Sequence, residues 1–173
     1  MSCILFSGTY DLKYLGSDIT WTSCTAEWGV CRVDFDYQHS NKLEINGHFY
    51  NKGILAHAAS EVKFDLAGQF KYLYACIGIG KYSRYTGCGV TDGEASFQVI
   101  GNGNVLRDWE QKNSPQNPTC FEISITGVSQ LTLKAKYDTR DCDLSTWADA
   151  KVYNKGIFLK FTSYEFNFKM LMF

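Results

Sequence analysis

The sequence contains no long apolar run and no block of charge of one sign. Its longest uninterrupted apolar runs cover a few residues, as from Cys3 to Phe6, so no segment is long enough to cross a membrane and none reads as a signal peptide. The 17 basic and 18 acidic residues give a net charge of -1 and are interspersed. We therefore expect no nucleic-acid partner and no membrane insertion. The compartment is open between the cytoplasm, export by another route, and a mature exported form.

Motifs for catalysis and for a structural zinc are also missing. The sequence has no G-x-S-x-G or H-E-x-x-H motif and no glycine-rich phosphate loop between a strand and a helix. No pair of cysteines has the spacing of a zinc knuckle. Asp34 with Asp36, or Asp141 with Asp143, could in principle act as glycosidase carboxylates, but nothing predicts the deep cleft that this chemistry needs. We predict a protein that is not an enzyme and requires no cofactor.

The cysteines are numerous, and their number is odd. With seven of them, at least one thiol is free or pairs between chains. The two tripeptides that come nearest to a glycosylation sequon, at 113–115 and 117–119, are both blocked by proline. Because usable sequons and a signal peptide are both missing, we expect the cysteines to be reduced.

Alternation of apolar and polar residues recurs along the whole chain, whereas no stretch of eleven or more residues has the spacing of an amphipathic helix. Asn46-Gly47 and the run from Gly101 to Asn104 each separate two alternating segments, which is typical of β-hairpins. At 173 residues the chain suits a single domain. We predict an all-β, two-sheet antiparallel β-sandwich of the jelly-roll type. Its strands are expected at 19–21, 30–35, 42–50, 62–66, 70–79, 97–106, 121–125, 131–137 and 147–152.

The tail from residue 154 to residue 173 differs from the rest in composition. If it is extended, aromatic and methionine side chains share one face, namely Tyr164, Phe166, Phe168, Met170 and Met172. Such a strand would aggregate if it were left exposed at a sheet edge. We expect it to add an edge strand or to form a homodimer contact.

A polar corner precedes the strand at 62–66 and offers candidate ligand-binding side chains. His57, Ser60 and Glu61 lie there, and their hydrogen-bonding groups on a rigid sheet suit a hydroxyl-rich ligand. The alternative is that His57 caps a turn and Glu61 is solvated.

Aromatic residues offer a second kind of candidate group, since a ring can stack on the apolar C–H face of a hydroxyl-rich ligand. Trp28 could be the stacking platform or a core residue, and Trp109 could be exposed in a polar loop or cover a sheet edge. Tyr82, Arg84 and Tyr85 combine stacking with forked donors on one loop, which could also be an ordinary solvated loop. Trp21 and Trp147 fall within alternating strands, so we expect both in the core.

Seven separated stretches match one family in order and spacing: Tyr14-Leu15-Gly16-Ser17-Asp18, Trp21-Thr22-Ser23, Glu27-Trp28-Gly29, Lys52-Gly53-Ile54 with His57-Ala58-Ala59-Ser60-Glu61 and Asp65-Leu66, Phe97-Gln98-Val99, Thr126-Gly127-Val128 with Gln130-Leu131, and Trp147-Ala148-Asp149-Ala150. Through them residues 14 to 152 resemble the NPCBM family of carbohydrate-binding modules. The resemblance implies a galactose-binding-like β-sandwich, usually extracellular and joined to glycoside hydrolases. It also implies recognition of galactose-type sugars and, in some members, a structural calcium ion. We take residues 1–153 as the module.

The chain departs from the family pattern where the family carries acidic residues. Gly80-Lys81-Tyr82 replaces an acidic run, and the segment from Asp143 to Thr146 lacks the family's histidine and second aspartate. Calcium prefers six to eight oxygen ligands, several of them anionic, so any Ca²⁺ would have to rely on Asp18, Asp143 and Asp149.

These observations predict a lectin-like module that binds galactose-configured glycans without turning them over. His57 and Glu61 are its polar pair, because both lie on a matching stretch. The alternative function is a protein–protein interaction module on the same sandwich, with no sugar binding.

Overall fold

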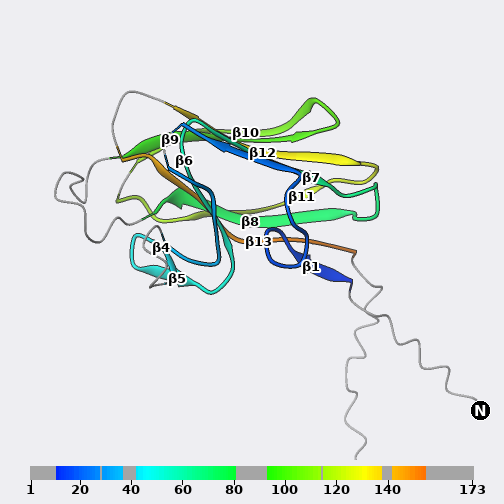
Figure 1. Cartoon of the computed structure of the whole chain (residues 1–173), viewed down its shortest axis with the longest axis horizontal. Coiled ribbons are helices and arrows are strands. Elements are labelled where there is room, and N and C mark those ends of the chain that lie inside the picture. The colour runs from blue at the N-terminus through cyan, green and yellow to red at the C-terminus, as the bar shows by residue number, and fades with distance from the viewer. Residues whose placement is uncertain are drawn as a thin grey trace, which may run out of the picture.

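The computed structural model describes residues 11–27, 29–36, 42–80, 93–113, 115–137 and 142–154. These residues form thirteen β-strands and no helix. The strands make two antiparallel sheets that pack face to face, with a small hairpin on one outer face (Figure 1). The predicted all-β sandwich is therefore confirmed. No helix in the described ranges is long and apolar enough to cross a membrane.

Each sheet joins strands that are distant in sequence. In the first sheet the order is β11 (Thr119–Ser124), β8 (Tyr72–Ile79), β13 (Leu144–Tyr153), β6 (Gly53–His57) and β3 (Arg32–Val33), with β1 (Leu12–Tyr14) also beside β13. In the second it is β10 (Asn104–Asn113), β9 (Glu94–Gly101), β12 (Gln130–Tyr137), β7 (Ser60–Asp65) and β2 (Ser23–Ala26). The predicted strand at 19–21 is wrong, because Ile19 forms only an isolated bridge with Leu15.

One apolar core fills the space between the sheets. Strand β7 shows how the sequence builds it, since Val62 and Phe64 are buried while Lys63 and Asp65, which alternate with them, are exposed. Trp147 is completely buried and packs edge-to-face on Phe97, as expected for a core residue. Trp21 is half-buried and packs against the margin of this core.

The two open sides of the sandwich are closed by different means. On one side a disulfide joins Cys24, in edge strand β2, to Cys31, which precedes edge strand β3. On the other side Trp109 of β10 packs on Phe121 of β11, with ring centroids 4.2 Å apart. Trp109 therefore lies in a strand, and its assignment to a polar loop is wrong; its ring covers the sheet edge instead.

The expectation of reduced cysteines is also wrong. Besides the Cys24–Cys31 bridge, Cys76 of β8 and Cys120 of β11 are directly opposite in the ladder and form a second disulfide. Cys142 is disulfide-bonded as well. Because disulfides form and persist in oxidising compartments, this pairing favours export over residence in the cytoplasm.

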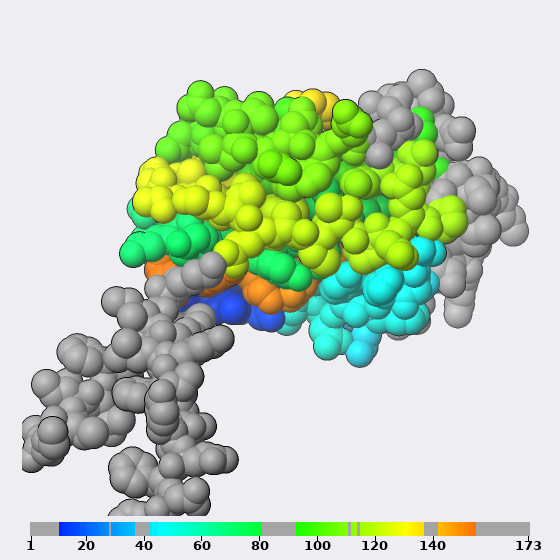
Figure 2. Space-filling model, turned by 180° about the vertical axis from the view of Figure 1, so that it is seen from behind, coloured from blue at the N-terminus to red at the C-terminus, as the bar shows by residue number. Residues whose placement is uncertain are grey.

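The predicted hairpin at Asn46-Gly47 consists of β4 (Leu43–Ile45) and β5 (His48–Tyr50). Both turn residues have positive φ, as a type I′ turn requires. The hairpin lies across the outer face of the first sheet and buries Leu43 and Ile45 there. Gly78 makes this close approach possible, since a Cβ at that position would be 2.5 Å from Ile45 Cγ2. In the space-filling view the hairpin is the cyan patch that adjoins the sandwich at its lower edge (Figure 2).

The first and last described strands are neighbours. Leu12 of β1 pairs with Tyr153 of β13, so the chain enters and leaves the sandwich at the same end (Figure 1). The tail at 155–173, with its predicted edge strand or dimer contact, lies outside the described residues.

Candidate functional site

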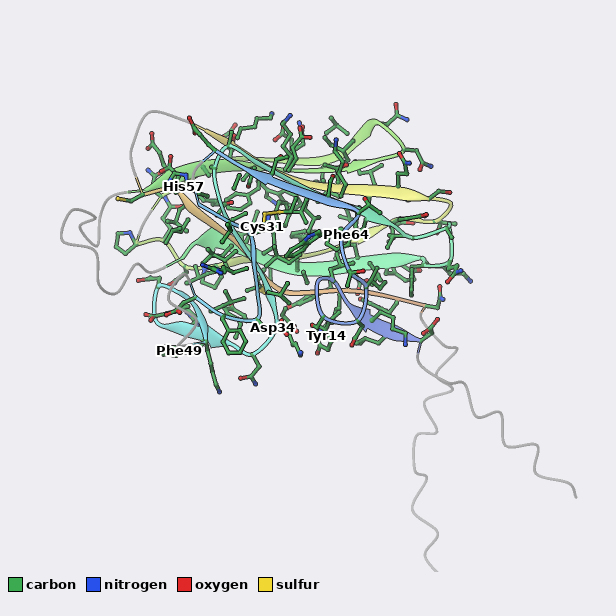
Figure 3. The ribbon with its side chains drawn as sticks, in the orientation of Figure 1. Tyr14, Cys31, Asp34, Phe49, His57 and Phe64 are labelled. Carbon is green, nitrogen blue, oxygen red and sulfur yellow. A yellow bond between two sulfur atoms is a disulfide. The ribbon has the colours of Figure 1, made fainter. Side chains whose placement is uncertain are left out.

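The connection from β6 to β7, a corner formed by residues 57–60, lies at one end of the sandwich. The register places His57 opposite Leu144, the first residue of β13, and Ser60 opposite Ala26, the last residue of β2. Ser145 pairs with Ile79, so β8 also ends there. We call this end, opposite to the Leu12–Tyr153 pair, the His57 end (Figure 3).

His57 is half-buried, and hydrogen bonds hold the backbone around it. Its Nδ1 lies 2.6 Å from the carbonyl oxygen of Ala58, the turn contact that the sequence had left as an alternative. The Ala58 amide donates to the carbonyl of Asp143 at 2.8 Å. Asp143 is fully buried, and its Oδ1 accepts from the Glu94 amide at 2.7 Å. The corner is thus tied to the beginnings of both β13 and β9.

A second contact holds the corner from the side of β2. The Glu27 amide donates to the carbonyl of Ala59 at 2.8 Å, and the Ala59 amide donates back to Glu27 Oε2 at 3.2 Å. The sequence analysis did not single out Glu27 as a site residue. The available signal was its place in the Glu27-Trp28-Gly29 stretch, which matches the family pattern.

Ser60 takes part in the interior rather than the surface of the corner. Its side chain is buried, with Oγ 3.3 Å from Ser145 Oγ. Ser145 in turn donates to the carbonyl of Ala56 at 2.5 Å. This chain of hydroxyls satisfies polar groups between the two sheets, where an unpaired group would be costly.

Glu61 lies on a different sheet from His57. It is in β7, on the outer face of the second sheet, where it accepts from Lys134 at 2.6 Å and pairs with Lys63 at 3.3 Å. The hydrogen bond from Lys134, followed by the one from Lys63, holds the pKa of Glu61 below its ordinary value even though burial acts to raise it. The structure therefore gives Glu61 a role in an ion-pair network and does not place it beside His57.

This lowered pKa predicts a pH dependence. A carboxyl whose pKa is lower in the folded state stabilises the fold above its unfolded value, about 4.3, and the stabilisation is lost as the pH falls through the folded pKa. We expect Glu61→Gln to lower the unfolding midpoint at pH 7 but to leave it nearly unchanged at pH 2. The effect should be below about 1 kcal/mol, because the pair is partly exposed and screened by solvent. Urea unfolding at both pH values measures it, and an equal loss at pH 2 would contradict the ion-pair explanation.

The aromatic candidates are not gathered at the corner. Trp109 lies in the same row of the second sheet as Phe97, Ala135 and Ser60, so three strand spacings, roughly 14 Å, separate it from Ser60. Arg107 lies over its ring, with 5.7 Å between Cζ and the ring centroid. Trp28 and the loop residues Tyr82, Arg84 and Tyr85 lie outside the described residues.

The three predicted calcium ligands do not form one cluster. Asp18 accepts from the Tyr14 amide at 2.8 Å and lines a hollow of about 220 Å³ that also includes Leu66. Asp149, in β13, pairs with Lys151 at 2.7 Å. It comes six positions after Asp143, which directly precedes β13, so the two aspartates are roughly 20 Å apart at the rise of an extended strand. Within the described ranges, no group of three His, Cys, Asp or Glu side chains is placed to hold a metal ion. These residues do not fit a shared calcium site.

Comparison with known proteins gives one family. The model of the NPCBM/NEW2 domain matches residues 13–153. A curated protein of Renibacterium salmoninarum, named "Putative endo-alpha-N-acetylgalactosaminidase", is 28% identical over 145 residues. The match covers 78% of this chain but only 9% of that protein.

Solved structures of CBM51 modules share the fold. The CBM51 of Clostridium perfringens GH95, in complex with methyl-galactose, has a TM-score of 0.69 at 23% identity, with 82% of this chain and 99% of that chain covered. The CBM51-2 and INT domains of C. perfringens ZmpB, in a structure with GlcNAc, have a TM-score of 0.71 at 19% identity. That match covers 82% of this chain and 31% of that chain. The tandem CBM51 modules of Sp3GH98, a family 98 glycoside hydrolase of Streptococcus pneumoniae, have a TM-score of 0.69 at 19% identity. That match covers 83% of this chain and 47% of that chain.

Proposed function

Because the chain belongs to the NPCBM/NEW2 domain family, we propose that it is a non-catalytic carbohydrate-binding module whose ligands are galactose-configured glycans. The family match includes the whole His57 corner, and this observation carries the proposal. Two relatives support the galactose configuration: a CBM51 module in complex with methyl-galactose, and a curated relative named for N-acetylgalactosamine. The GlcNAc complex of another CBM51 module makes that sugar the natural comparison in a test.

The sugar site of this proposal is at the His57 end. Because Nδ1 donates to the Ala58 carbonyl, Nε2 is the acceptor nitrogen of the half-buried imidazole, and an acceptor at a fixed position can distinguish an axial from an equatorial hydroxyl. The hydrogen bonds of Ala58, Asp143 and Glu94 hold the corner before a ligand arrives. Such preorganisation reduces the entropy that binding would otherwise cost. The stacking partner in this proposal is Trp28 or the Tyr82–Tyr85 loop.

The arrangement of the acidic residues supports binding without turnover. Asp34 belongs to one of the two aspartate pairs considered above as glycosidase carboxylates. It accepts hydrogen bonds from Lys52 at 2.7 Å and from the Gly53 amide at 3.0 Å. The hydrogen bond that Lys52 donates to Asp34 raises the pKa of Lys52, so the lysine stays protonated in this pair at neutral pH. Asp36, its partner in that pair, is buried. These contacts give Asp34 a structural role at the β3–β6 junction.

A glycan array tests the proposal. We expect the purified chain to bind galactose-terminated glycans, methyl-galactoside to compete, and GlcNAc to compete less well. His57→Ala should weaken binding about tenfold, since losing one hydrogen bond to a buried sugar hydroxyl costs about 1.4 kcal/mol. His48→Ala is the matched control, because His48 is exposed on the hairpin. Arrays with calcium and with a chelator test the predicted ion separately.

Each other outcome of the array has a defined meaning. Preference for GlcNAc would contradict the galactose part of the proposal and leave the module function intact. Unchanged affinity in His57→Ala would move the site away from the corner, toward the loop with Tyr82 and Tyr85. A blank array in both conditions would overturn sugar binding in favour of a protein-interaction module.

A further inference from the structure

The loop from Cys24 to Cys31, which we call the bridged loop, is fixed at two points. At its base the disulfide joins Cys24 to Cys31, only seven positions apart. Cys24 pairs with Val62 in the second sheet, whereas Arg32, next to Cys31, pairs with Leu55 in the first, so the bridge links the edges of both sheets. Figure 3 shows Cys31 between the sheets, with His57 farther toward one end.

At its far end the bridged loop holds the corner through Glu27. The Glu27 backbone amide and side-chain carboxylate satisfy both the carbonyl and the amide of Ala59. The neighbouring residue, Ala58, donates its amide to the carbonyl of Asp143, which directly precedes β13. The two residues that follow His57 are therefore held by two different elements, and the bond from the Ala59 amide to the Glu27 carboxylate is charge-assisted.

We propose that Glu27 is a positioning residue for the carbohydrate site, and that the Cys24–Cys31 disulfide keeps it in place. Glu27 does not need to touch the sugar, because it acts by fixing the corner that carries His57. The part that concerns sugar affinity rests on the proposed function.

The disulfide adds a restraint to a loop base that two short ladders also hold. Four residues of β2 pair with β7, two residues of β3 pair with β6, and both β2 and β3 lie at sheet edges. Edge elements with few contacts open locally at low free-energy cost. Without the bridge, these edge strands open more readily, and the Glu27 carboxylate is held less firmly at the Ala59 amide.

Amide exchange of Ala59, followed by NMR in the full chain, tests the positioning without any sugar. We expect about tenfold faster exchange in Glu27→Ala and in the Cys24→Ala/Cys31→Ala variant, because the acceptor of this amide is lost or released. Glu27→Gln keeps an acceptor oxygen and should retain most of the protection. Glu110→Ala, which removes an exposed carboxylate from β10, is the matched control.

Affinity for methyl-galactoside, measured by calorimetry, tests the link to binding. Glu27→Ala and the Cys24→Ala/Cys31→Ala variant should each bind at least about fivefold more weakly. Glu27→Gln and Glu110→Ala should bind like the wild type. Removing the other bridge, with Cys76→Ala/Cys120→Ala, should leave affinity unchanged, because that bridge lies between β8 and β11.

The two measurements separate failure of this inference from failure of the proposed function. Unchanged Ala59 exchange in both Glu27→Ala and Cys24→Ala/Cys31→Ala would overturn the positioning role, whatever the sugar data show. Faster exchange with unchanged affinity would overturn the link to binding. If the wild type bound neither methyl-galactoside nor any glycan on the array, the proposed function would fail, and the exchange data alone would decide the positioning role.

Discussion

Trp147→Ala is expected to lower the free energy of unfolding by about 3 to 5 kcal/mol, the cost of emptying a fully buried tryptophan site. The side chain has no exposed surface and meets Phe97 edge-to-face at 5.2 Å, an arrangement that adds stability beyond burial alone. Single domains are stable by only about 5 to 15 kcal/mol, so this loss removes a large fraction of the total stability and should lower the urea midpoint markedly. Urea unfolding followed by far-UV circular dichroism measures the effect.

Trp147→Phe is the informative control. Among the described residues, no acceptor is paired with the buried Trp147 Nε1, and phenylalanine removes this donor while keeping a ring against Phe97. We expect it to cost less than half as much as alanine, since loss of the unpaired donor offsets part of the lost volume. An alanine variant as stable as the wild type would contradict the placement of Trp147 at the centre of the core.

Removal of the Cys76–Cys120 disulfide is expected to destabilise the protein more than removal of Cys24–Cys31. The first bridge closes a sequence separation of 44 residues and the second a separation of 7. The chain-entropy model then gives about 4 kcal/mol for the long loop and about 2.5 kcal/mol for the short one, because the longer cross-link removes more freedom from the unfolded chain. The long bridge should therefore contribute more to the stability of the fold than the short one.

The double variants Cys76→Ala/Cys120→Ala and Cys24→Ala/Cys31→Ala test this order, and replacing both partners leaves no lone thiol behind. Thiol titration of the denatured wild type first establishes that these four cysteines are oxidised. Urea midpoints under the same conditions then compare the two losses. A larger loss for the short bridge would show that contacts at the sheet edges outweigh the entropy of the unfolded chain.

The sequence predicted those parts of the fold that depend on local pattern. Alternation located β7 and β12, an apolar run located β8, and the Asn46-Gly47 pair located the hairpin, because these features depend only on neighbouring residues. Strands β1 and β2 were missed. They are short edge strands whose partners, β13 and β7, are distant in sequence.

The candidate site was harder to predict, because its geometry depends on which sheet each strand joins. Residues 57–61 read as one polar corner, yet β6 and β7 belong to different sheets, so Glu61 points into a lysine network away from His57. Glu27 was missed because its partner, Ala59, is 32 positions away. The disulfides were missed because the lack of sequons and of a signal peptide was taken to indicate reduced cysteines, and cysteine spacing does not reveal which strands will be neighbours.

The pairing of Leu12 with Tyr153 has a consequence for how the protein can be built into larger molecules. A domain whose first and last strands are neighbours can be inserted into a longer polypeptide with little change to the structure of the flanking segments. The His57 end then faces away from the attachment point. If several copies were joined in series by linkers that let their His57 ends reach one ligand-bearing surface, weak contacts at each copy would combine into a higher overall affinity.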